Sequence, residues 1–595
     1  MSALTNPFAV TTPDSLSAKD AYDLFVDVFS EYPQILRPGH LFLQGPRGTG
    51  KSMMFRYLLP DCQIIEHNCS IHDLSFMSFY VPFKHTALDI TELGRLDGVH
   101  GDVYINEHFL VSHISMQLFG TFAKHINVQD SIPLPEIQSF FKTAFVPYLR
   151  RSGYFEEIEE DSITDSVGYI EKIGAVCADI FHDVQRYIKR LALNVGKTSY
   201  EGPLLDYSGF LLPLLKKLRQ LECMPDGPTF LLLDDADNLN SRQAQVLNSW
   251  VAARTTADLS LKISTQLDYP TYRTVSGRII SAPHDYSEIE ISTTYTTNTY
   301  NNYQKRVKKI VAKRLAHADI DCSPEDFFPA HKKQQIKLKK KEEELRKRHR
   351  AGKGRGYRPG DDARRYAFSE YMKSLAGTSK SLQSYHYAGL EQLVHISSGV
   401  VRFFLDAATL MYNLEWSDPD LRPVTHVRPH IQDQAVRTMG QKFLYDRLDQ
   451  ELRDKSPFAF DKADLDKLYN LIHVLGGSFK MKLLSDDAER SVYSIAISNT
   501  PSDEVRRVLT LGAKLGFFHI STIGNKEGTG RTRLYILTRM LAPHFNLDPT
   551  GFAGYLFVTN RVLEEAMANP DTTLRRVKEK GVEEVFDLRQ LTLFP

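Results

Sequence analysis

Short apolar runs alternate with longer amphipathic stretches along the first half of this chain. Each run has the length of a buried strand and is bounded by polar or turn residues. These runs are residues 41–43, 77–83, 229–234, 259–264 and 288–292. In the stretches between them apolar residues recur every three or four positions, which predicts amphipathic helices, most clearly at 107–125, 167–193 and 241–254. The alternation predicts an α/β fold, a three-layer core built on a parallel sheet.

The first apolar run leads directly into a glycine-rich turn. This turn has the pattern G-x-x-x-x-G-K-S and consists of Gly45, Pro46, Arg47, Gly48, Thr49, Gly50, Lys51 and Ser52. In such a loop the glycines let backbone N–H groups point inward around phosphates, the lysine reaches the β and γ oxygens, and the serine hydroxyl ligates Mg²⁺. A helix that begins there adds the positive end of its dipole. The pattern predicts a nucleotide-binding site; a glycine turn without a ligand is the alternative.

The apolar run at 229–234 ends in the carboxylates Asp234, Asp235 and Asp237. The apolar residues force the strand into the core, so the acids lie at its carboxyl end. There Asp234 would join the coordination shell of Mg²⁺, and Asp235 would polarise the attacking water. A strand that simply leaves the core is the alternative, but the upstream loop favours the catalytic interpretation. We expect ATP and Mg²⁺ as cofactors, since no N-K-x-D sequence of the kind that reads guanine is present.

The interval between the glycine-rich turn and these carboxylates is long, at about 180 residues. A minimal core of this type needs far fewer, and helical patterns fill much of the interval. We therefore expect a helical insertion at about 90–205, after which residues 207–221 lead back to the strand at 229. No pattern within the insertion indicates its function.

Composition narrows the class of protein. With 595 residues, 42% of them hydrophobic, the chain can bury large cores and should form roughly three or four domains. No run approaches the ~18 consecutive apolar residues of a membrane span, and the N-terminus lacks a basic region followed by an apolar core, so we expect a cytoplasmic protein. The five cysteines are scattered and form no C-x-x-C pair, which argues against a disulfide framework and against a zinc site.

Charge is balanced overall but concentrated in one segment. Residues 332–365 hold 15 Lys and Arg against 5 Asp and Glu, a local charge of +10 in a chain of zero net charge. The first half of this segment has helix-forming composition, and the second half, rich in Gly, Arg and Pro, should be flexible. One interpretation is an arm that contacts the phosphate backbone of DNA or RNA; the other is a charged, solvated helix between domains.

These motifs and three others give the chain a resemblance to the AAA+ ATPases, within them to the ORC/Cdc6-type branch and its prokaryotic relatives. Residues 234–239 resemble the D-E-x-D-x-L Walker B motif of that branch. Gly399 to Arg402, at the start of a helix over 403–414, resembles its G-x-x-R sensor 2, and residues 307–315 resemble its first lid helix. The C-terminal part resembles a winged-helix domain, with helices at 464–475 and 502–516 and a hairpin of 517–523 and 531–537 around 525–530.

The resemblance implies a domain plan. Residues 1–300 would form the AAA+ P-loop core, 301–445 a helical lid, and 446–595 the winged helix and a C-terminal tail. The basic insertion at about 328–383 would interrupt the lid, and the resemblance explains neither it nor the insertion at 90–205. Asn6, Pro7 and Phe8 resemble the adenine-pocket segment of AAA+ proteins, against the alternative of an ordinary N-terminal tail.

The resemblance also implies roles for individual residues. Lys51, Ser52, Asp234 and Asp235 would be the catalytic and metal-binding core. Thr265, with Ser264 as its neighbour, would be sensor 1, or else a polar residue that caps a strand end. Arg402 would carry lid charge to the γ-phosphate, and Arg278 or Arg273 would be the arginine finger for a neighbouring subunit. Asp235 departs from the family's glutamate and is one methylene shorter, so hydrolysis would be slow.

Two functions from different classes fit these patterns. In the first, an ATP-dependent switch assembles into a homo-oligomer, binds duplex DNA through the winged helix and the basic segment 332–365, and recruits or controls a protein partner. The DNA-facing candidates are Arg506, Arg507, Lys514, Lys526, Arg531 and Arg533. In the second, the chain is a protein-sensing regulatory NTPase, as in antiphage defence, that controls an effector, and its winged helix is an autoinhibitory or partner-binding module.

Overall fold

The computed structural model divides into two compact units. The N-terminal unit is Thr11–Ile291, and the C-terminal unit combines Met1–Val10 with Ser292–Pro595. The residues that the structure describes are 6–10, 12–27, 32–83, 102–127, 132–160, 163–193, 199–253, 259–266, 269–291, 300–354, 358–376, 385–454, 460–485, 491–524, 531–550 and 554–586. No helix among these residues is long and apolar enough to cross a membrane. All five cysteines are free thiols.

A five-stranded parallel sheet is the centre of the N-terminal unit, in the order β2-β3-β4-β1-β5. Its strands are β1 (Leu41–Gln44), β2 (Met77–Pro82), β3 (Thr229–Asp234), β4 (Leu259–Thr265) and β5 (Ser287–Glu290). Every residue of β3 and β4 is buried, whereas three of the four residues of the edge strand β5 are exposed. The five predicted strands are confirmed.

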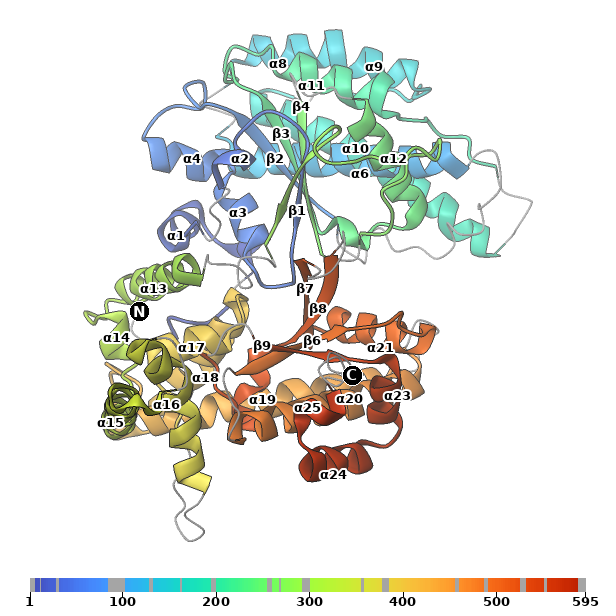
Figure 1. Ribbon diagram of the computed structural model, residues 1–595. Helices are drawn as coiled ribbons and strands as arrows, with labels where there is room; N and C mark the ends of the chain where they lie inside the picture. Colours follow the sequence, from blue (N-terminus) through green and yellow to red (C-terminus); the bar gives the residue numbers. More distant parts are fainter. Residues whose placement is uncertain are drawn as a thin grey trace. The chain divides into compact units, whose positions relative to one another are not determined.

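Helices lie on both sides of this sheet (Figure 1). The helices of the unit are α1 (Ala18–Leu24), α2 (Tyr32–Ile35), α3 (Lys51–Tyr57), α4 (Pro60–His67), α6 (Asp102–His125), α8 (Leu134–Phe140), α9 (Val146–Arg151), α10 (Ser166–Leu193), α11 (Leu212–Leu218) and α12 (Ser241–Ala252). Short helical turns are η2 (Pro13–Ser15), η4 (Phe141–Phe145), η5 (Tyr207–Leu211) and η6 (Ala236–Asn238). The predicted α/β class with a parallel-sheet core is confirmed.

One helix of the 90–205 region, α6, packs directly on the sheet, and α10 packs on α6. The helix α6 contacts β2 and α12, and α10 lies along α6. Phe109 of α6 and Phe181 of α10 stack with ring centroids 5.2 Å apart, and both belong to the core that includes Phe79 of β2 and Leu231 of β3. The predicted helices at 107–125 and 167–193 are confirmed, and α6 begins five residues earlier than its apolar periodicity suggested.

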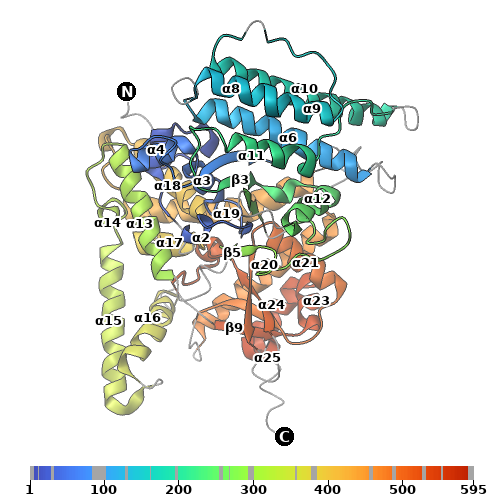
Figure 2. The same cartoon turned by 90° about the horizontal axis from the view of Figure 1, so that it is seen from above.

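The first part of the C-terminal unit is helical. Its elements are α13 (Tyr300–His317), α14 (Pro324–Phe327), α15 (Lys332–Arg348), η8 (His349–Lys353), α16 (Pro359–Ala376), α17 (Leu390–Ile396), α18 (Val401–Trp416), η9 (Pro419–Leu421) and α19 (Pro429–Arg453). The predicted helices at 307–315 and 403–414 lie within α13 and α18. Two helices that are 17 and 18 residues long, α15 and α16, pack side by side as a hairpin (Figure 2).

Residues 6–10 are packed into the C-terminal unit and are not a free tail. Phe8 is fully buried, with its ring 5.6 Å from that of Phe327 and 5.5 Å from that of Phe328. The Asn6 side chain donates to the carbonyl of Thr409 over 2.9 Å, and Arg314 of α13 donates to the carbonyl of Pro7 over 2.9 Å. The alternative of an ordinary N-terminal tail is therefore wrong.

The last part of the C-terminal unit contains a four-stranded sheet in the order β7-β8-β6-β9. Its elements are α20 (Lys462–Leu484), β6 (Val492–Ile497), α21 (Asp503–Lys514), β7 (Phe518–Gly524), β8 (Arg531–Leu537), η10 (Arg539–Leu541), α22 (Ala542–Phe545), β9 (Gly554–Val558), α23 (Asn560–Ala568), α24 (Pro570–Lys580) and α25 (Val582–Phe586). The two predicted helices and the antiparallel β7–β8 hairpin are present. The hairpin tip at 525–530, with Lys526, lies outside the described residues.

Candidate functional site

The candidate site lies at the carboxyl edge of the parallel sheet. The strand β4 lies between β1 and β3, with Gln44 opposite Thr265 and Leu233 opposite Ile263. The glycine-rich turn leaves β1, and the carboxylates follow β3. The carboxyl ends of parallel strands all lie at the same edge of a sheet. The end of β4 therefore lies between the glycine-rich turn and the carboxylates.

Two left-handed glycines shape the turn that follows β1. Gly48 has φ 83° and Gly50 has φ 104°, conformations that other residues rarely adopt. Between them, the Thr49 hydroxyl donates to the carbonyl of Pro46 over 2.9 Å. A Cβ at Gly45 would come within 2.9 Å of the Cβ of Ile291, so only glycine fits there. The helix α3 begins at Lys51, immediately after the turn.

Lys51 reaches back over the loop. Its Nζ donates to the carbonyls of Gly45 (2.6 Å) and Pro46 (3.1 Å), and the residue is only 5% exposed. Burial lowers the pKa of Lys51, and the negative charges of Asp234 and Asp235 oppose that shift. The ammonium group is thus held at the loop by backbone carbonyl groups that a phosphate can replace as the stronger partner.

Asp234 is almost fully buried at the end of β3, at 1% exposure. The Ser264 hydroxyl donates to its Oδ1, and the Tyr80 hydroxyl donates to its Oδ2 over 2.9 Å. Burial, followed by the charge of Asp234, raises the pKa of Tyr80 far above its usual value, so Tyr80 remains a donor. Two neutral donors from neighbouring strands therefore orient this carboxylate.

Asp235 has a left-handed backbone, with φ 58° and ψ 45°. Its N–H donates to the Ser264 hydroxyl over 3.0 Å, so Ser264 connects both carboxylate residues. Asp and Asn adopt this conformation more readily than longer side chains. The backbone thus gives a physical reason for a short side chain such as aspartate at this position. Burial, followed by the charges of Asp234 and Asp237, raises the pKa of Asp235 to about 6.

The end of β4 carries three polar residues with different contacts. The Thr265 hydroxyl donates to the carbonyl of Gln266 over 3.0 Å, and Thr265 is fully buried. Gln266 instead reaches the carboxylates: its N–H and its side-chain amide donate to Asp237 over 3.1 Å and 2.5 Å. The structure brings Ser264 and Gln266 to the acidic cluster, and it turns the Thr265 hydroxyl back to its own chain. The sensor 1 role of Thr265 stays a prediction.

The three predicted arginines lie apart from this cluster in the chain. Arg402 is exposed in the first turn of α18, in the C-terminal unit. In the N-terminal unit, Arg278 forms a salt bridge of 2.7 Å to the buried carboxylate of Asp285, and Arg273 donates to the carbonyl of Gly277 over 3.0 Å. Their roles toward a γ-phosphate or a neighbouring subunit remain predictions.

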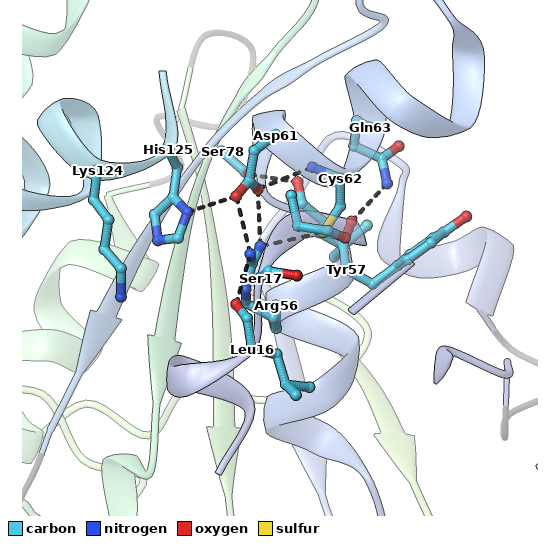
Figure 3. Close-up of polar contacts among 12 residues, drawn as sticks. Leu16, Ser17, Arg56, Tyr57, Asp61, Cys62, Gln63, Ser78, Lys124 and His125 are labelled. Carbon is cyan, nitrogen blue, oxygen red and sulfur yellow. Dashed lines mark hydrogen bonds and ion pairs between the residues drawn. The ribbon is translucent and has the colours of Figure 1, made fainter. Parts of the chain in front are cut away.

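A buried ionic cluster anchors the far end of α3 (Figure 3). Arg56, at 4% exposure, pairs with both oxygens of Asp61 over 2.8 Å and 2.9 Å and donates to the carbonyl of Leu16 over 3.2 Å. His125, the last residue of α6, lies 2.8 Å from Asp61. Burial raises the pKa of Asp61, but hydrogen bonds from His125 and Arg56 outweigh it and hold that pKa below its usual value. Sequence reasoning missed this cluster.

The residues at the site fit ATP and Mg²⁺. The loop supplies left-handed glycines and a buried lysine, and α3, which carries Ser52 in its first turn, packs against β3, which ends at Asp234. One hydroxyl and one carboxylate oxygen suit Mg²⁺, which takes its remaining ligands from phosphates and water. Among the described residues, no three His, Cys, Asp or Glu side chains gather into a protein-only metal site.

The sheet order, the loop after β1 and the acidic end of β3 are those of the P-loop class of nucleotide-binding proteins. Within that class, the ORC-CDC6-like family model matches residues 6–557, nearly the whole chain. The chain therefore belongs to the ORC-CDC6-like family, a branch of the AAA+ proteins, and the resemblance inferred from its motifs is confirmed.

Two solved structures are similar along almost their entire length, at low identity. The structure of the Aeropyrum pernix Orc1 protein in complex with DNA is 11% identical, with 97% of each chain covered and a TM-score of 0.28. Cdc6p from Pyrobaculum aerophilum is 13% identical, with 94% of this chain and 97% of that chain covered and a TM-score of 0.27. No curated protein matches the chain.

Proposed function

We propose that the protein is an ATP-binding and ATP-hydrolysing molecular switch. The observation that carries this proposal is the convergence of Lys51 and Asp234 on one edge of the sheet, joined through Ser264 to Asp235. Membership of the ORC-CDC6-like family supports the same activity. The N-terminal unit would be the AAA+ core, α13 and α17 to α19 the lid, and the elements from α20 onward a winged-helix domain.

The chain's own residues define how hydrolysis would proceed. Bound ATP and Mg²⁺ supply the reacting phosphoryl group and the charge that neutralises it. Lys51 would exchange its contacts with Gly45 and Pro46 for phosphate oxygens, while Ser52 and Asp234 hold the metal. Asp235 would accept a hydrogen bond from the attacking water, and because its side chain is one methylene shorter than glutamate, we expect slow turnover. Arg402 and Arg278 would report nucleotide state to the lid and to a neighbouring subunit.

The wider proposal is that ATP drives assembly of a homo-oligomer that binds duplex DNA and controls a protein partner. Its DNA-binding part has support from the family and from the charge of 332–365. The helix α21 lends less support, because Arg506 pairs with Asp503 over 2.8 Å and Arg507 pairs with Asp464 over 3.2 Å. These pairs favour a second candidate, a protein-sensing regulator whose winged helix packs against protein.

One experiment separates the two candidates. ATP hydrolysis would be measured with and without duplex DNA, and oligomer size would be measured by light scattering in the same samples. Stimulation by DNA together with ATP-dependent assembly supports the DNA-bound switch. A rate of ATP hydrolysis that is the same with and without duplex DNA supports the protein-sensing regulator. Lys51→Ala is the control, because it should abolish nucleotide binding, and hydrolysis by that variant would contradict the proposed site.

A further inference from the structure

One face of the helix α15 carries a group of exposed cations. At 3.6 residues per turn, positions that differ by 7, 8, 15 or 18 residues lie on the same side of a helix. Counted from residue 332, these are the positions of five exposed cations, here called the outer strip: Lys332, Lys339, Lys340, Lys347 and, one residue into η8, Arg350. Ile336, which is 67% exposed, and Glu343 are the other residues on this face.

The opposite side of α15 is used for packing. Near its start, the buried Gln334 exchanges two hydrogen bonds of 2.9 Å with the backbone of His386. Near its end, Leu345 packs with Tyr366 and Ala367 of α16. The partner helix α16 is itself held against α20, where the Ser369 hydroxyl donates to the carbonyl of Leu483 over 2.5 Å. The outer strip is therefore fixed in direction by contacts on the other side of the helix.

The salt bridges that the described residues of the α15–α16 hairpin form involve cations outside the outer strip. Glu344 pairs with Lys341 over 2.9 Å, Glu342 pairs with Arg346, and Glu370 of α16 pairs with Arg348 over 3.1 Å. Among the residues that the structure describes, no carboxylate forms a salt bridge with the five cations of the outer strip. Three of the nearby carboxylates are thus engaged with cations beside the strip, and the exposed face itself carries five cations against one carboxylate, Glu343.

We propose that the outer strip of α15 binds the phosphate backbone of duplex DNA without reading its sequence. The strip is about 27 Å long at 1.5 Å per residue, and duplex DNA carries a charge about every 1.7 Å along its axis. An excess of cations along this length, five against the single carboxylate of Glu343, matches that ligand. Protein interfaces commonly have an apolar core and helices that lie in a membrane have an apolar face, whereas Ile336 is the one apolar residue on the face of the outer strip, which favours duplex DNA. The inference deepens the proposed function and rests on its DNA-binding part alone.

The test compares two triple variants of the full-length protein. In the outer variant, Lys339→Gln, Lys340→Gln and Lys347→Gln remove three cations of the strip. In the matched variant, Lys337→Gln, Lys341→Gln and Arg348→Gln remove the same charge from the other side of α15. Binding of a fluorescent random-sequence duplex would be followed by anisotropy from about 50 to 200 mM salt.

The outer variant should lose at least about tenfold in affinity at the lower salt concentration, and the slope of log K against log salt should fall by about 2 to 3. The matched variant should retain both values to within about twofold, since Lys341 and Arg348 already pair with Glu344 and Glu370. Equal losses in the two variants would mean that only net charge matters and would overturn the proposal. Unchanged binding in the outer variant would overturn it as well and would leave the strip as a solvated surface.

Two further measurements separate this inference from the proposed function. ATP binding by the outer variant should equal that of the wild type, since none of its three residues belongs to the nucleotide site. If the wild type binds ATP but not duplex DNA, the strip inference fails while the ATPase proposal stands. Anionic vesicles of phosphatidylserine are the second probe, and binding to vesicles with none to DNA would assign the strip to a membrane surface instead.

Discussion

Charged residues at the nucleotide edge of the sheet and those on α15 are stabilised in opposite ways. At the sheet edge, Lys51 and Asp234 are buried, and each has hydrogen-bond partners within the chain. On α15, Lys339 and Lys347 are exposed, and the carboxylates of Glu342 and Glu344 pair with other cations. A buried charged residue depends on the exact positions of its few hydrogen-bond partners, so a single substitution there should abolish the activity of the site. The exposed cations of α15 would attract a ligand through the sum of their charges, so a single substitution there should have a small, salt-dependent effect on affinity.

The largest effect is expected at Asp235. Replacing it with Asn keeps the size of the side chain and suits the left-handed backbone, but removes the carboxylate that would polarise the water. Hydrolysis should fall about 10² to 10⁴-fold while ATP binding is retained. Single-turnover hydrolysis and ATP titration would measure both. Equal hydrolysis by the variant and the wild type would remove Asp235 from the mechanism.

The raised pKa of Asp235 adds a pH dependence to that prediction. A carboxylate with a pKa of about 6 is protonated below that pH and cannot accept the water's proton. The wild-type value of kcat/KM should therefore fall about tenfold per pH unit below pH 6. Asp235→Asn should lack this limb of the profile. The same acid limb in both proteins would assign it to another group.

The next largest effect is expected at the ionic cluster behind α3. Asp61→Asn leaves the guanidinium of Arg56 buried without its charge partner, which should cost about 3 kcal/mol in the free energy of unfolding. Each unit has one tryptophan, so a Trp416→Phe background makes Trp250 report on the N-terminal unit in denaturant unfolding. Adding Arg56→Met to Asp61→Asn should recover part of the loss. A double variant less stable than Asp61→Asn would contradict charge burial as the cause.

A smaller, pH-dependent effect is expected at Lys262, a buried lysine on β4. Its Nζ donates to the carbonyls of Arg37 (2.6 Å) and Gly39 (2.9 Å), and burial lowers its pKa to about 7. Between pH 7 and the ordinary lysine pKa of 10.5, the unfolded chain binds the proton and the folded chain does not. Stability should therefore rise with pH, by at most about 1.4 kcal/mol per unit.

Lys262→Met should flatten this dependence, and Trp250 fluorescence in the Trp416→Phe background would follow it. The stability difference between wild type and variant should grow from pH 7 to pH 9 in favour of the wild type. Parallel curves for the two proteins would show that Lys262 keeps its proton throughout this range.

The smallest effect on DNA affinity is expected from substitutions on α21, whose cations, unlike those of the outer strip, are paired with carboxylates. Arg506→Gln with Arg507→Gln removes two exposed cations that are already paired with Asp503 and Asp464. Affinity for duplex DNA should change by less than about twofold. A larger loss, together with a lower salt slope, would move the DNA-binding surface from the outer strip to the winged-helix elements.

Local patterns predicted the sheet of the N-terminal unit because each of its strands is a short, contiguous apolar run. The run at 229–234 is apolar throughout because β3 is buried on both faces, and the glycine-rich turn is a contiguous motif. The start of α6 was missed because Asp102 and Asn106 are polar yet buried, with Asn106 donating to the Asp102 carboxylate over 2.7 Å. The strands β6 and β9 were also missed, since they pair with each other across about 60 residues.

The site was predicted in its motif residues but not in the contacts that connect them. Ser264 and Asp234 are 30 residues apart, and Tyr80 and Asp234 are 154 apart, so no local pattern links either pair. The left-handed backbone at Asp235 is equally invisible to periodicity. The cluster of Arg56, Asp61 and His125 depends on the meeting of α3, α4 and α6, which only the tertiary fold produces.

The burial of Phe8 bears on where the protein can be shortened or tagged. Residues 6–10 belong to the C-terminal unit although they precede the whole N-terminal unit in the chain. Trimming them would leave the rings of Phe327 and Phe328 without their aromatic neighbour and would remove the Asn6 contact to α18. A truncated protein that begins with the N-terminal unit would therefore have a less stable C-terminal unit. A bulky N-terminal fusion should be separated from Asn6 by a spacer.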